Sequence, residues 1–309
     1  MRFMQIISGF LISSCIMANP LVAAELEFST VEGVGGIPLN VVQTGNRDGF
    51  GILLIHGFGQ GALAFKNQLH SDLAEEFHVV AFDMRGHATS GKPWRREDLV
   101  GSEIWGGDVA KVVEATNIKR PVLVGWSFGG FVAIDYLRHY GVDSVAGINL
   151  VGSHGGLMPR PIFGSGRQMT DAIKKVLDNS RMSRSLDPVD NITAARLTAQ
   201  GFYTPNMKAA DKEEQFAFGI MMPSYVRRAM MGRDLNNTDF VSKLTAPVLL
   251  TRGDSDLVIS QQDAEKLVGL LPDGDIAYYA NTGHLPFFSH PERYNKELAA
   301  FTRRVNKPQ

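Results

Sequence analysis

The chain has 309 residues, of which 44% are hydrophobic and 20% charged, a composition typical of folded globular proteins and not of disordered ones. The 31 basic and 32 acidic side chains leave a net charge of −1, which gives no basic surface that would indicate a nucleic-acid partner. The single cysteine excludes a disulfide framework and a zinc site built from cysteines.

Residues 1–24 have the layout of a cleaved secretory signal peptide. Arg2 precedes a stretch without charges over residues 3–24, and the first part of this stretch is mostly apolar. Val22-Ala23-Ala24 presents small residues at the positions that a signal peptidase recognises, so we expect the mature chain to begin at Glu25. The mature protein would then be periplasmic or secreted.

Two other interpretations of this segment stay open. An uncleaved N-terminal anchor would need the same uncharged stretch to span a bilayer, although several serines, a glycine, Asn19 and Pro20 dilute its hydrophobicity. Ile12-Ser13-Ser14-Cys15 loosely fits a lipoprotein cleavage box, which would attach the protein to lipid through Cys15. No later stretch is long and apolar enough to cross a membrane, so we expect no stable insertion once the signal is removed.

Short apolar runs that alternate with helical patterns predict an α/β fold, with a mostly parallel sheet flanked by helices. Three of these runs are continuous rather than alternating, which indicates strands that are buried on both faces. The helix candidates are Asp108–Thr116, Gly129–His139 and Gln261–Leu270. The predicted strands are Leu39–Gln43, Gly51–Ile55, His78–Phe82, Val122–Gly125, Val145–Leu150, Val248–Thr251 and Asp275–Tyr279.

Two predicted strands end in glycine-containing turns. His56-Gly57-Phe58-Gly59 follows the strand at 51–55, and we interpret His56 as a residue that braces this loop. Asp83-Met84-Arg85-Gly86-His87 follows the next strand, and we interpret it as a turn-bracing cluster with a structural Asp–Arg pair.

The strand at 122–125 runs into a Gly-x-Ser-x-Gly-Gly turn and then a helix. A serine on such a tight turn needs neighbours without bulk, which Gly125 and Gly129 provide, and the turn projects the Ser127 hydroxyl out of the sheet. Ser127 is therefore the candidate nucleophile. The oxyanion of acyl transfer needs two fixed N–H donors, and we expect the backbone amides of Phe58 and Phe128 to supply them.

Residues 153–239 interrupt the alternation of strands and helices and contain no convincing strand. We expect a helical cap here, lying over one end of a core formed by residues 25–152 and 240–309. The cap is rich in methionine, which suits the wall of an apolar pocket. Its helix candidates are Gln168–Asn179, Asp190–Gln200, Lys212–Met221 and Ser224–Met231.

A serine hydroxyl needs a base held by a carboxylate before it can act as a nucleophile at neutral pH. Asp254 and Asp256 lie just beyond the strand at 248–251, and His284 lies just beyond the last strand. Since ligands bind where the carboxyl ends of parallel strands meet, these residues are the candidate acid and base. Among the eight histidines, His154 at the start of the cap is the serious rival to His284.

These motifs resemble those of the α/β-hydrolase superfamily across residues 37–302. His56–Gly59 resembles its oxyanion loop, Asp83–Ser90 its Asp-x-Arg-Gly-x-Gly-x-Ser turn, Gly125–Gly130 its nucleophile elbow and Gly283–Phe287 its histidine loop. The resemblance implies the α/β-hydrolase fold with the helical cap inserted after the sixth strand.

The resemblance also guides the choice between the two acids. It favours Asp256 as the acid that orients the histidine, whereas Asp254 would only cap the turn. The chain departs from the family pattern at Ala88, where glycine is usual, and at Ile259, where a proline commonly follows the acid. We expect the alanine to tighten its turn without affecting the chemistry.

Within the superfamily, the elbow and the short oxyanion loop look like those of small esterases, cofactor-free haloperoxidases and C–C hydrolases. Ser127 argues against dehalogenases and epoxide hydrolases, which have aspartate at this position. The resemblance therefore implies a serine hydrolase that needs no cofactor and no metal. The substrate would be a small-molecule ester, and nothing in the sequence indicates an oligomeric state.

Phe58, Trp126 and Phe128 are apolar and are expected at the same edge of the sheet as Ser127, and Trp126 is a candidate substrate-binding residue. Apolar walls suit an uncharged ligand, so we expect small neutral carboxylic esters. Arg227 and Arg228 are the candidate cations if the substrate is anionic. The alternatives are lactone hydrolysis, C–C cleavage, perhydrolysis or cyanohydrin lysis by the same residues, or a ligand-binding protein on the same fold.

Overall fold

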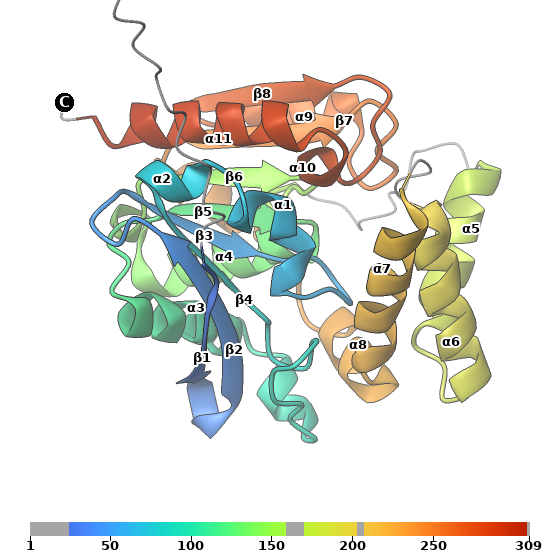
Figure 1. Cartoon of the computed structure of the whole chain (residues 1–309). Coiled ribbons are helices and arrows are strands. Elements are labelled where there is room, and N and C mark those ends of the chain that lie inside the picture. The colour runs from blue at the N-terminus through green and yellow to red at the C-terminus, as the bar shows by residue number, and fades with distance from the viewer. Residues whose placement is uncertain (1–24, 159–169, 203–206, 308–309) are drawn as a thin grey trace, which may run out of the picture.

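The computed structural model describes residues 25–158, 170–202 and 207–307, so the predicted signal peptide and Cys15 lie outside the described residues. The described chain contains one sheet of eight strands in the order β1-β2-β4-β3-β5-β6-β7-β8 (Figure 1). The strands are β1 (Glu27–Glu32), β2 (Pro38–Gly45), β3 (Gly51–Ile55), β4 (His78–Phe82), β5 (Val122–Trp126), β6 (Gly147–Val151), β7 (Val248–Gly253) and β8 (Gly274–Tyr279).

The sheet is mostly parallel. β1 pairs with β2 and β2 with β4 in antiparallel register, and every other pair is parallel. Leu53 of β3 lies between Val80 of β4 and Leu123 of β5, so the three central strands share one register. The predicted fold class is therefore confirmed.

Helices cover both faces of the sheet and bury its strands. Leu53 and Ile55 of β3 belong to one hydrophobic core, whereas Ile52 and Leu54 belong to the other, as expected for side chains that alternate between faces. The first core contains α3 (Ser102–Thr116), α4 (Phe128–Tyr140) and α9 (Gln261–Val268), and the second contains α1 (Lys66–Leu69), α2 (Leu73–Glu76), α10 (Pro286–Ser289) and α11 (Pro291–Val305).

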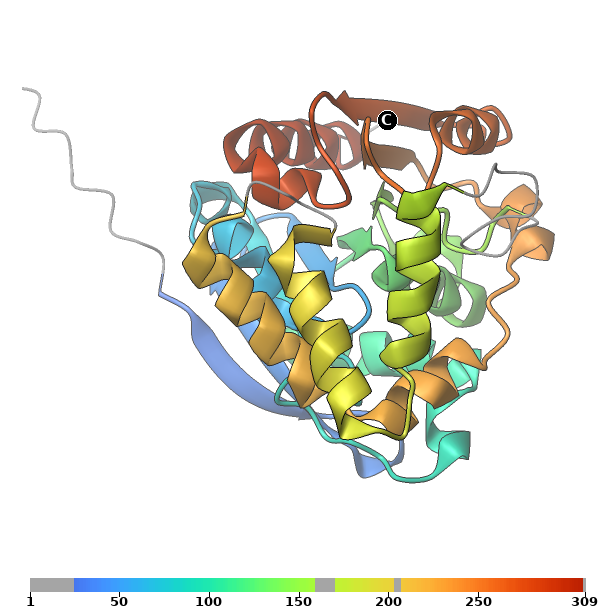
Figure 2. The same cartoon turned by 90° about the vertical axis from the view of Figure 1, so that its right-hand side faces the viewer.

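The helical cap follows β6, and in Figure 2 its helices lie in front of the sheet. It consists of α5 (Asp171–Met182), α6 (Pro188–Leu197), a π-helical turn (Thr198–Phe202), α7 (Ala209–Met221) and α8 (Ser224–Met231). Thr170 and Asp187 cap the first two helices by accepting the backbone N–H groups of Ile173 and Val189. Short 3-10 helices lie at Val34–Gly36, Ala62–Phe65, Arg96–Leu99, Val142–Ser144 and Thr238–Lys243.

The N-terminal strand β1 was not predicted from the sequence. Val31 is its one buried residue, and Phe28 is exposed, so the strand lacks the apolar run that marked the others. It lies at the edge of the sheet and pairs only with β2. With β1 included, the strand that precedes the cap is the sixth in the chain.

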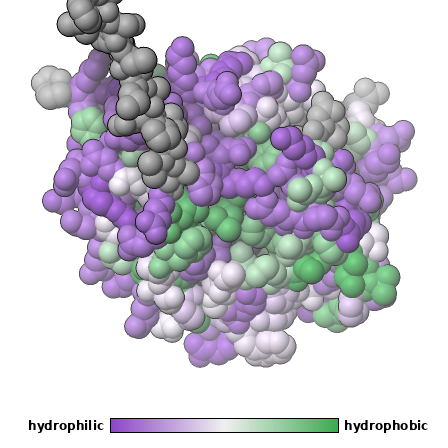
Figure 3. Space-filling model, viewed as in Figure 1, coloured by the Kyte–Doolittle hydropathy of each residue, from purple (hydrophilic) through white to green (hydrophobic). Residues whose placement is uncertain are grey.

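The surface in Figure 3 is mainly hydrophilic, with hydrophobic side chains that show toward its lower right, on the side of the cap. Leu186, Val189 and Ile192, at the α5–α6 turn and on α6, are exposed. No helix in the described ranges is long and apolar enough to cross a bilayer.

The carboxyl ends of β3 to β8 all meet at one edge of the sheet, because these six strands are parallel. Each predicted site residue lies at this edge: Phe58, Ser127, Asp256 and His284 are in the turns that leave it, Trp126 ends β5, and Phe128 begins α4. The fold thus gathers segments that are more than 200 residues apart in the chain, from His56 to His284, at one end of the molecule.

Candidate active site

Ser127 lies on a tight turn between β5 and α4. Its backbone has φ 53° and ψ −114°, a conformation that few residues other than glycine adopt. Such strain costs about 1–3 kcal/mol and persists only where surrounding structure enforces it. Here the Ser127 N–H donates to the carbonyl of Val151, and the Gly130 N–H donates to the carbonyl of Ser127, at 2.9 and 3.1 Å.

Close packing explains the glycines on either side of the serine. A Cβ on Gly129 would lie 2.1 Å from the carbonyl oxygen of Ile55, and one on Gly125 would lie 2.6 Å from the Cα of Gly130. Any side chain at either position would push the first turn of α4 away from β3 and β5. The two glycines therefore allow the turn to form.

His284 and Asp256 approach each other at the ends of β8 and β7. The Nδ1 atom of His284 lies 3.1 Å from Oδ1 and 3.0 Å from Oδ2 of Asp256, and both side chains are buried. The Oδ1 atom of Asp256 also accepts the N–H groups of Val258 and Ile259, which fix the carboxylate in place. Gly152 allows this contact, because a Cβ there would lie 2.7 Å from the His284 Nδ1 atom.

Asp254 has a different position from Asp256. It is exposed, and its carboxylate accepts the backbone N–H groups of Asn281 and Thr282 at 2.8 and 3.1 Å. These hydrogen bonds lower the pKa of Asp254. Asp254 thus ties the turn after β7 to the loop that carries His284, and its carboxylate bonds to that loop's backbone rather than to the histidine ring.

Trp126 connects the serine turn to the same histidine loop. Its indole Nε1–H donates to the carbonyl of His284 at 3.1 Å, and its ring packs against Phe287 with 5.1 Å between centroids. Trp126 also lines the cavity beside Ser127. The residue predicted to contact substrate therefore also holds the backbone of His284.

The loop after β3 lies against the serine turn. A Cβ on Gly57 would lie 3.2 Å from the Cβ of Ser127, and the rings of Phe58 and Phe128 are 6.2 Å apart. Within the described part of the chain, the backbone amides of Phe58 and Phe128 have no hydrogen-bond acceptor in the protein. Two unpaired N–H donors beside a serine suit the binding of a developing oxyanion.

His56 braces the loop, as predicted. It is fully buried, its Nδ1 lies 2.8 Å from the carbonyl of Gly57, and its Nε2 accepts the N–H of Met84 at 3.0 Å. Burial lowers the pKa of His56, so the ring is neutral at neutral pH. Its contacts join the turns after β3 and β4.

The turn after β4 is braced, but the predicted Asp–Arg pair within it is wrong. Asp83 accepts hydrogen bonds from Ala62 and Thr89 instead. Arg85 forms two hydrogen bonds of 2.6 Å with Asp108 on α3, and both side chains are buried. The guanidinium points away from the turn, because the planar fork matches a carboxylate on the neighbouring helix. Ala88 has φ 34°, in the region that the usual glycine adopts readily.

The structure separates His284 from its rival His154. His154 also lines the cavity and is buried, and burial lowers its pKa. Its Nδ1 atom, however, accepts the backbone N–H of Gly156 at 3.1 Å, where His284 has the Asp256 carboxylate. Only His284 has the carboxylate on Nδ1 that a base acting on Ser127 requires.

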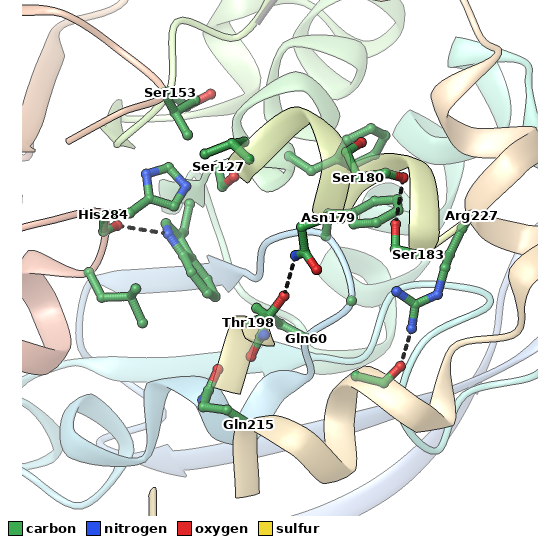
Figure 4. Close-up of a pocket in the computed structure, with 18 of the residues that line it drawn as sticks. Gln60, Ser127, Ser153, Asn179, Ser180, Ser183, Thr198, Gln215, Arg227 and His284 are labelled. Atoms are coloured by element: carbon green, nitrogen blue, oxygen red, sulfur yellow. Dashed lines mark hydrogen bonds between the residues drawn. The ribbon is translucent and has the colours of Figure 1, made fainter. Parts of the chain in front are cut away.

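A cavity of about 130 Å³ lies between the serine turn and the cap (Figure 4). Ser127 and His284 line one part of it, beside the rings of Phe58, Trp126 and Phe128. Its volume is comparable with the ~150 Å³ of an apolar cavity that admits benzene, so the substrate portion held there is small.

The cap contributes a polar wall, of which the sequence points only to Arg227, as one of two candidate cations. Among the described residues, Met207 and Met231 are the methionines that line the cavity, whereas Met222 packs in the core and Met221 is exposed. Most of the cap residues on this wall are polar: Asn179, Ser180, Ser183, Thr198, Gln215 and Arg227. The positions of these residues on their helices gave no signal, because a polar face is ordinarily a solvated one.

Comparisons with known proteins agree with this geometry. A model of the alpha/beta hydrolase family matches residues 52–297. The chain is 28% identical over 284 residues to the bifunctional esterase/perhydrolase DCH of Acinetobacter calcoaceticus, covering 87% of this chain and 97% of that protein. It is 26% identical to a non-heme chloroperoxidase of Streptomyces lividans, covering 84% and 94%. The crystal structure of the esterase RhEst1 from Rhodococcus sp. ECU1013 superposes with a TM-score of 0.79 at 28% identity, covering 90% and 99%.

Proposed function

The chain belongs to the α/β hydrolase family, and from that premise we propose that it is a serine esterase that cleaves small carboxylic esters through an acyl-enzyme intermediate. The observation that carries the proposal is that Asp256 is hydrogen-bonded to His284, which lines the same cavity as Ser127. The esterase relatives support hydrolysis of esters as the reaction class.

In the proposed first step, the Ser127 oxygen attacks the ester carbonyl carbon, and His284 Nε2 takes the hydroxyl proton. Asp256 stabilises the imidazolium that forms and holds the histidine in the tautomer with the proton on Nδ1. The amides of Phe58 and Phe128 donate to the carbonyl oxygen as it gains negative charge. The tetrahedral intermediate then collapses, the imidazolium proton passes to the leaving alkoxide, and the alcohol departs.

In the second step, water attacks the acyl-serine carbonyl while His284 accepts a proton from it. Collapse of the second tetrahedral intermediate releases the carboxylic acid, and the proton returns to the Ser127 oxygen. The apolar rings of Phe58, Trp126 and Phe128 line this part of the cavity and make it less polar than bulk water, which strengthens the oxyanion contacts. These rings agree with the sequence prediction of small neutral esters for the part of the substrate that lies beside them.

Perhydrolysis is the second candidate, because the bifunctional esterase/perhydrolase is among the relatives. Hydrogen peroxide would replace water in the second step, giving a peracid and free Ser127. The same residues would serve both reactions, so a peracid assay with acetate ester and peroxide tests this candidate alongside hydrolysis.

The proposal is tested with p-nitrophenyl esters of graded acyl length and a serine-directed fluorophosphonate. We expect release of p-nitrophenol, and one phosphonate adduct on Ser127 in the intact mass and its peptide map. The Ser127→Ala variant should lose both while keeping its circular dichroism spectrum. Full turnover by this variant, or an adduct elsewhere, would refute the assignment of the nucleophile.

A further inference from the structure

The cavity wall opposite His284 contains a buried cation. In Figure 4 Arg227 lies across the pocket from His284, with Asn179 and Thr198 between them. Arg227 is 5% exposed. Among the described residues that line the cavity it is the only lysine or arginine, and none is an aspartate or glutamate.

Arg227 is held by backbone carbonyls and not by a carboxylate. Its Nε donates to the carbonyl of Met222 at 3.0 Å, and its Nη2 donates to the carbonyl of Gly219, both at the C-terminal end of α7. No described acidic residue forms an ion pair with it, and burial lowers its pKa to about 10. The group is therefore still charged at neutral pH, with only the helix terminus to offset its charge.

The remaining nitrogen, Nη1, faces the oxyanion loop. A Cβ on Gly59 would lie 4.0 Å from this atom, and the guanidinium carbon lies 5.9 Å from the centre of the Phe58 ring. In the described part of the chain Nη1 has no protein acceptor. An anion bound to Nη1 would therefore share the cavity with an ester positioned at Ser127.

Two further residues that line the cavity have buried polar groups. The Oε1 of Gln60 and the Oδ1 of Asn179 have no hydrogen-bond partner, although both side chains are at least nine-tenths buried. Buried polar atoms without partners are costly, so a wall of this kind is suited to a ligand with its own polar groups. An apolar acyl chain would leave all three groups unpaired.

We propose that the cavity binds an ester with a free carboxylate at the end remote from the scissile bond, and that Arg227 Nη1 binds this carboxylate. The proposal rests on the proposed esterase function and names the substrate class of that site. A single guanidinium among neutral amides and hydroxyls matches a monoanion, whereas a doubly charged phosphate would need further cations. The prediction of neutral esters then holds only for the part of the substrate beside the apolar rings.

Matched esters test the proposal by pH-stat titration. Monoethyl glutarate places the carboxylate on the acyl side and is paired with ethyl 5-methylhexanoate, in which an isopropyl group replaces the carboxylate. 4-Acetoxybutanoate places the carboxylate on the alcohol side and is paired with 4-methylpentyl acetate, which has an isopropyl group in the same place. We expect the anionic ester of at least one pair to have the higher kcat/KM, and the pair that shows this identifies the side.

The matched variants are Arg227→Gln and Arg228→Gln. Arg228 is the next residue on α8, but it is exposed and does not line the cavity. We expect Arg227→Gln to lower the ratio of anionic to neutral kcat/KM by about tenfold to a hundredfold, the usual effect of losing a charge-assisted hydrogen bond. Arg228→Gln should leave the ratio unchanged. An equal ratio in wild type and Arg227→Gln would show that Arg227 only supports the end of α7.

Arg227→Lys covers the case in which the glutamine variant does not fold. A lysine keeps the positive charge but lacks the guanidinium group, which can bond to the Met222 carbonyl and to the ligand carboxylate at the same time. We therefore expect its ratio of anionic to neutral kcat/KM to lie between those of wild type and Arg227→Gln. A lysine variant with the ratio of wild type, or preference of wild type for the neutral ester in both pairs, would overturn the proposal.

Binding of monoethyl glutarate, a monoanion, to the Ser127→Ala variant separates this proposal from the esterase proposal. Calorimetry should detect binding that weakens at least tenfold when Arg227→Gln is added. Binding of monoethyl glutarate without turnover of any ester by the wild-type protein would refute the esterase function and keep the carboxylate site. Ester turnover without Arg227-dependent binding or selectivity would refute the carboxylate site and keep the esterase.

Discussion

Replacing Asp256 with asparagine removes one charge with almost no change in shape, and the surrounding hydrogen bonds determine how the new amide would lie. Oδ1 of Asp256 accepts the N–H of Val258 at 2.7 Å, so the asparagine oxygen is held at that position. The asparagine NH₂ group then takes the place of Oδ2, which is 3.0 Å from His284 Nδ1. Two donors cannot face each other, so Nδ1 must become the acceptor and the proton must move to Nε2.

A histidine with its proton on Nε2 cannot accept one from Ser127. The wrong tautomer lowers kcat by about 10⁴ in a serine protease, or roughly 5.5 kcal/mol of transition-state stabilisation. We expect a loss of this size for Asp256→Asn, measured as kcat on a p-nitrophenyl ester, with a KM close to that of wild type. The folded structure should be kept, because the N–H groups of Val258 and Ile259 still find an acceptor.

Asp254→Asn is the matched control, only two residues away. Its carboxylate accepts the N–H groups of Asn281 and Thr282 at an exposed position, so an amide oxygen can keep one of these bonds and water can replace the other. We expect less than a tenfold change in kcat/KM. If Asp254→Asn were crippled while Asp256→Asn kept activity within tenfold of wild type, the assignment of the acid would be reversed.

The remaining predictions concern the base, the cap and export. His284→Ala should be as severe as Ser127→Ala in kcat, and the double variant no worse than either, because the two residues act as a unit. Arg233→Met should lower the free energy of unfolding at pH 7 by about 3–5 kcal/mol in urea titrations, because it leaves Asp135 charged and buried without its partner. Burial raises the folded-state pKa of Asp135 to about 6, above its ~3.9 in unfolded chains, so stability falls as pH rises from about 4 to about 6 and levels off above that. At pH 5 the folded state keeps the carboxyl mostly protonated, so the loss in Arg233→Met should be smaller at pH 5 than at pH 7. N-terminal sequencing of the protein from a periplasmic or culture fraction should start at Glu25, whereas retention of residues 1–24 in membranes would support the anchor and a lipidated Cys15 the lipoprotein.

The sheet and the serine turn could be predicted because their signals are local. Val122 to Gly130 contains the strand, the turn and the start of the helix in nine consecutive residues, each with a pattern that reflects its own environment. The continuous apolar runs of β3, β5 and β7 reflect burial on both faces, which the two hydrophobic cores confirm. β1 was missed because an exposed edge strand has no such run.

The cavity wall could not be predicted, because the packing of the cap on the core decides which side of each helix faces inward. Arg227 and Arg228 are adjacent and chemically identical, yet one is 5% exposed in the cavity wall and the other lies on the surface. The methionines of the cap divide in the same way, since Met221 is exposed, Met222 packs in the core and Met231 lines the cavity. Consecutive side chains on an α-helix point in directions about 100° apart, so one can face the cavity while its neighbour faces the solvent or the core.

Hydrogen bonds between residues far apart in the chain could not be predicted from the sequence either. Arg85 was assigned to Asp83 because the two are close in sequence, but it pairs with Asp108, 23 positions away. Asp83 lies just after a strand, and Asp108 lies on a helix that packs against the sheet. Only the angle between α3 and the sheet decides which of them meets the guanidinium.

The strained conformation of Ser127 explains why so many polar groups around it are buried and bonded. The turns around Ser127 are joined to one another by hydrogen bonds between residues of different turns. His56 joins the first two turns through Met84, Trp126 holds the carbonyl of His284, and Asp254 fixes the loop that carries that histidine. A backbone strained by about 1–3 kcal/mol would relax if any one loop could move alone. Because the loops are linked, relaxation of the serine turn would have to break several hydrogen bonds at once, and the nucleophile, its base and the oxyanion donors keep their relative positions in the absence of substrate.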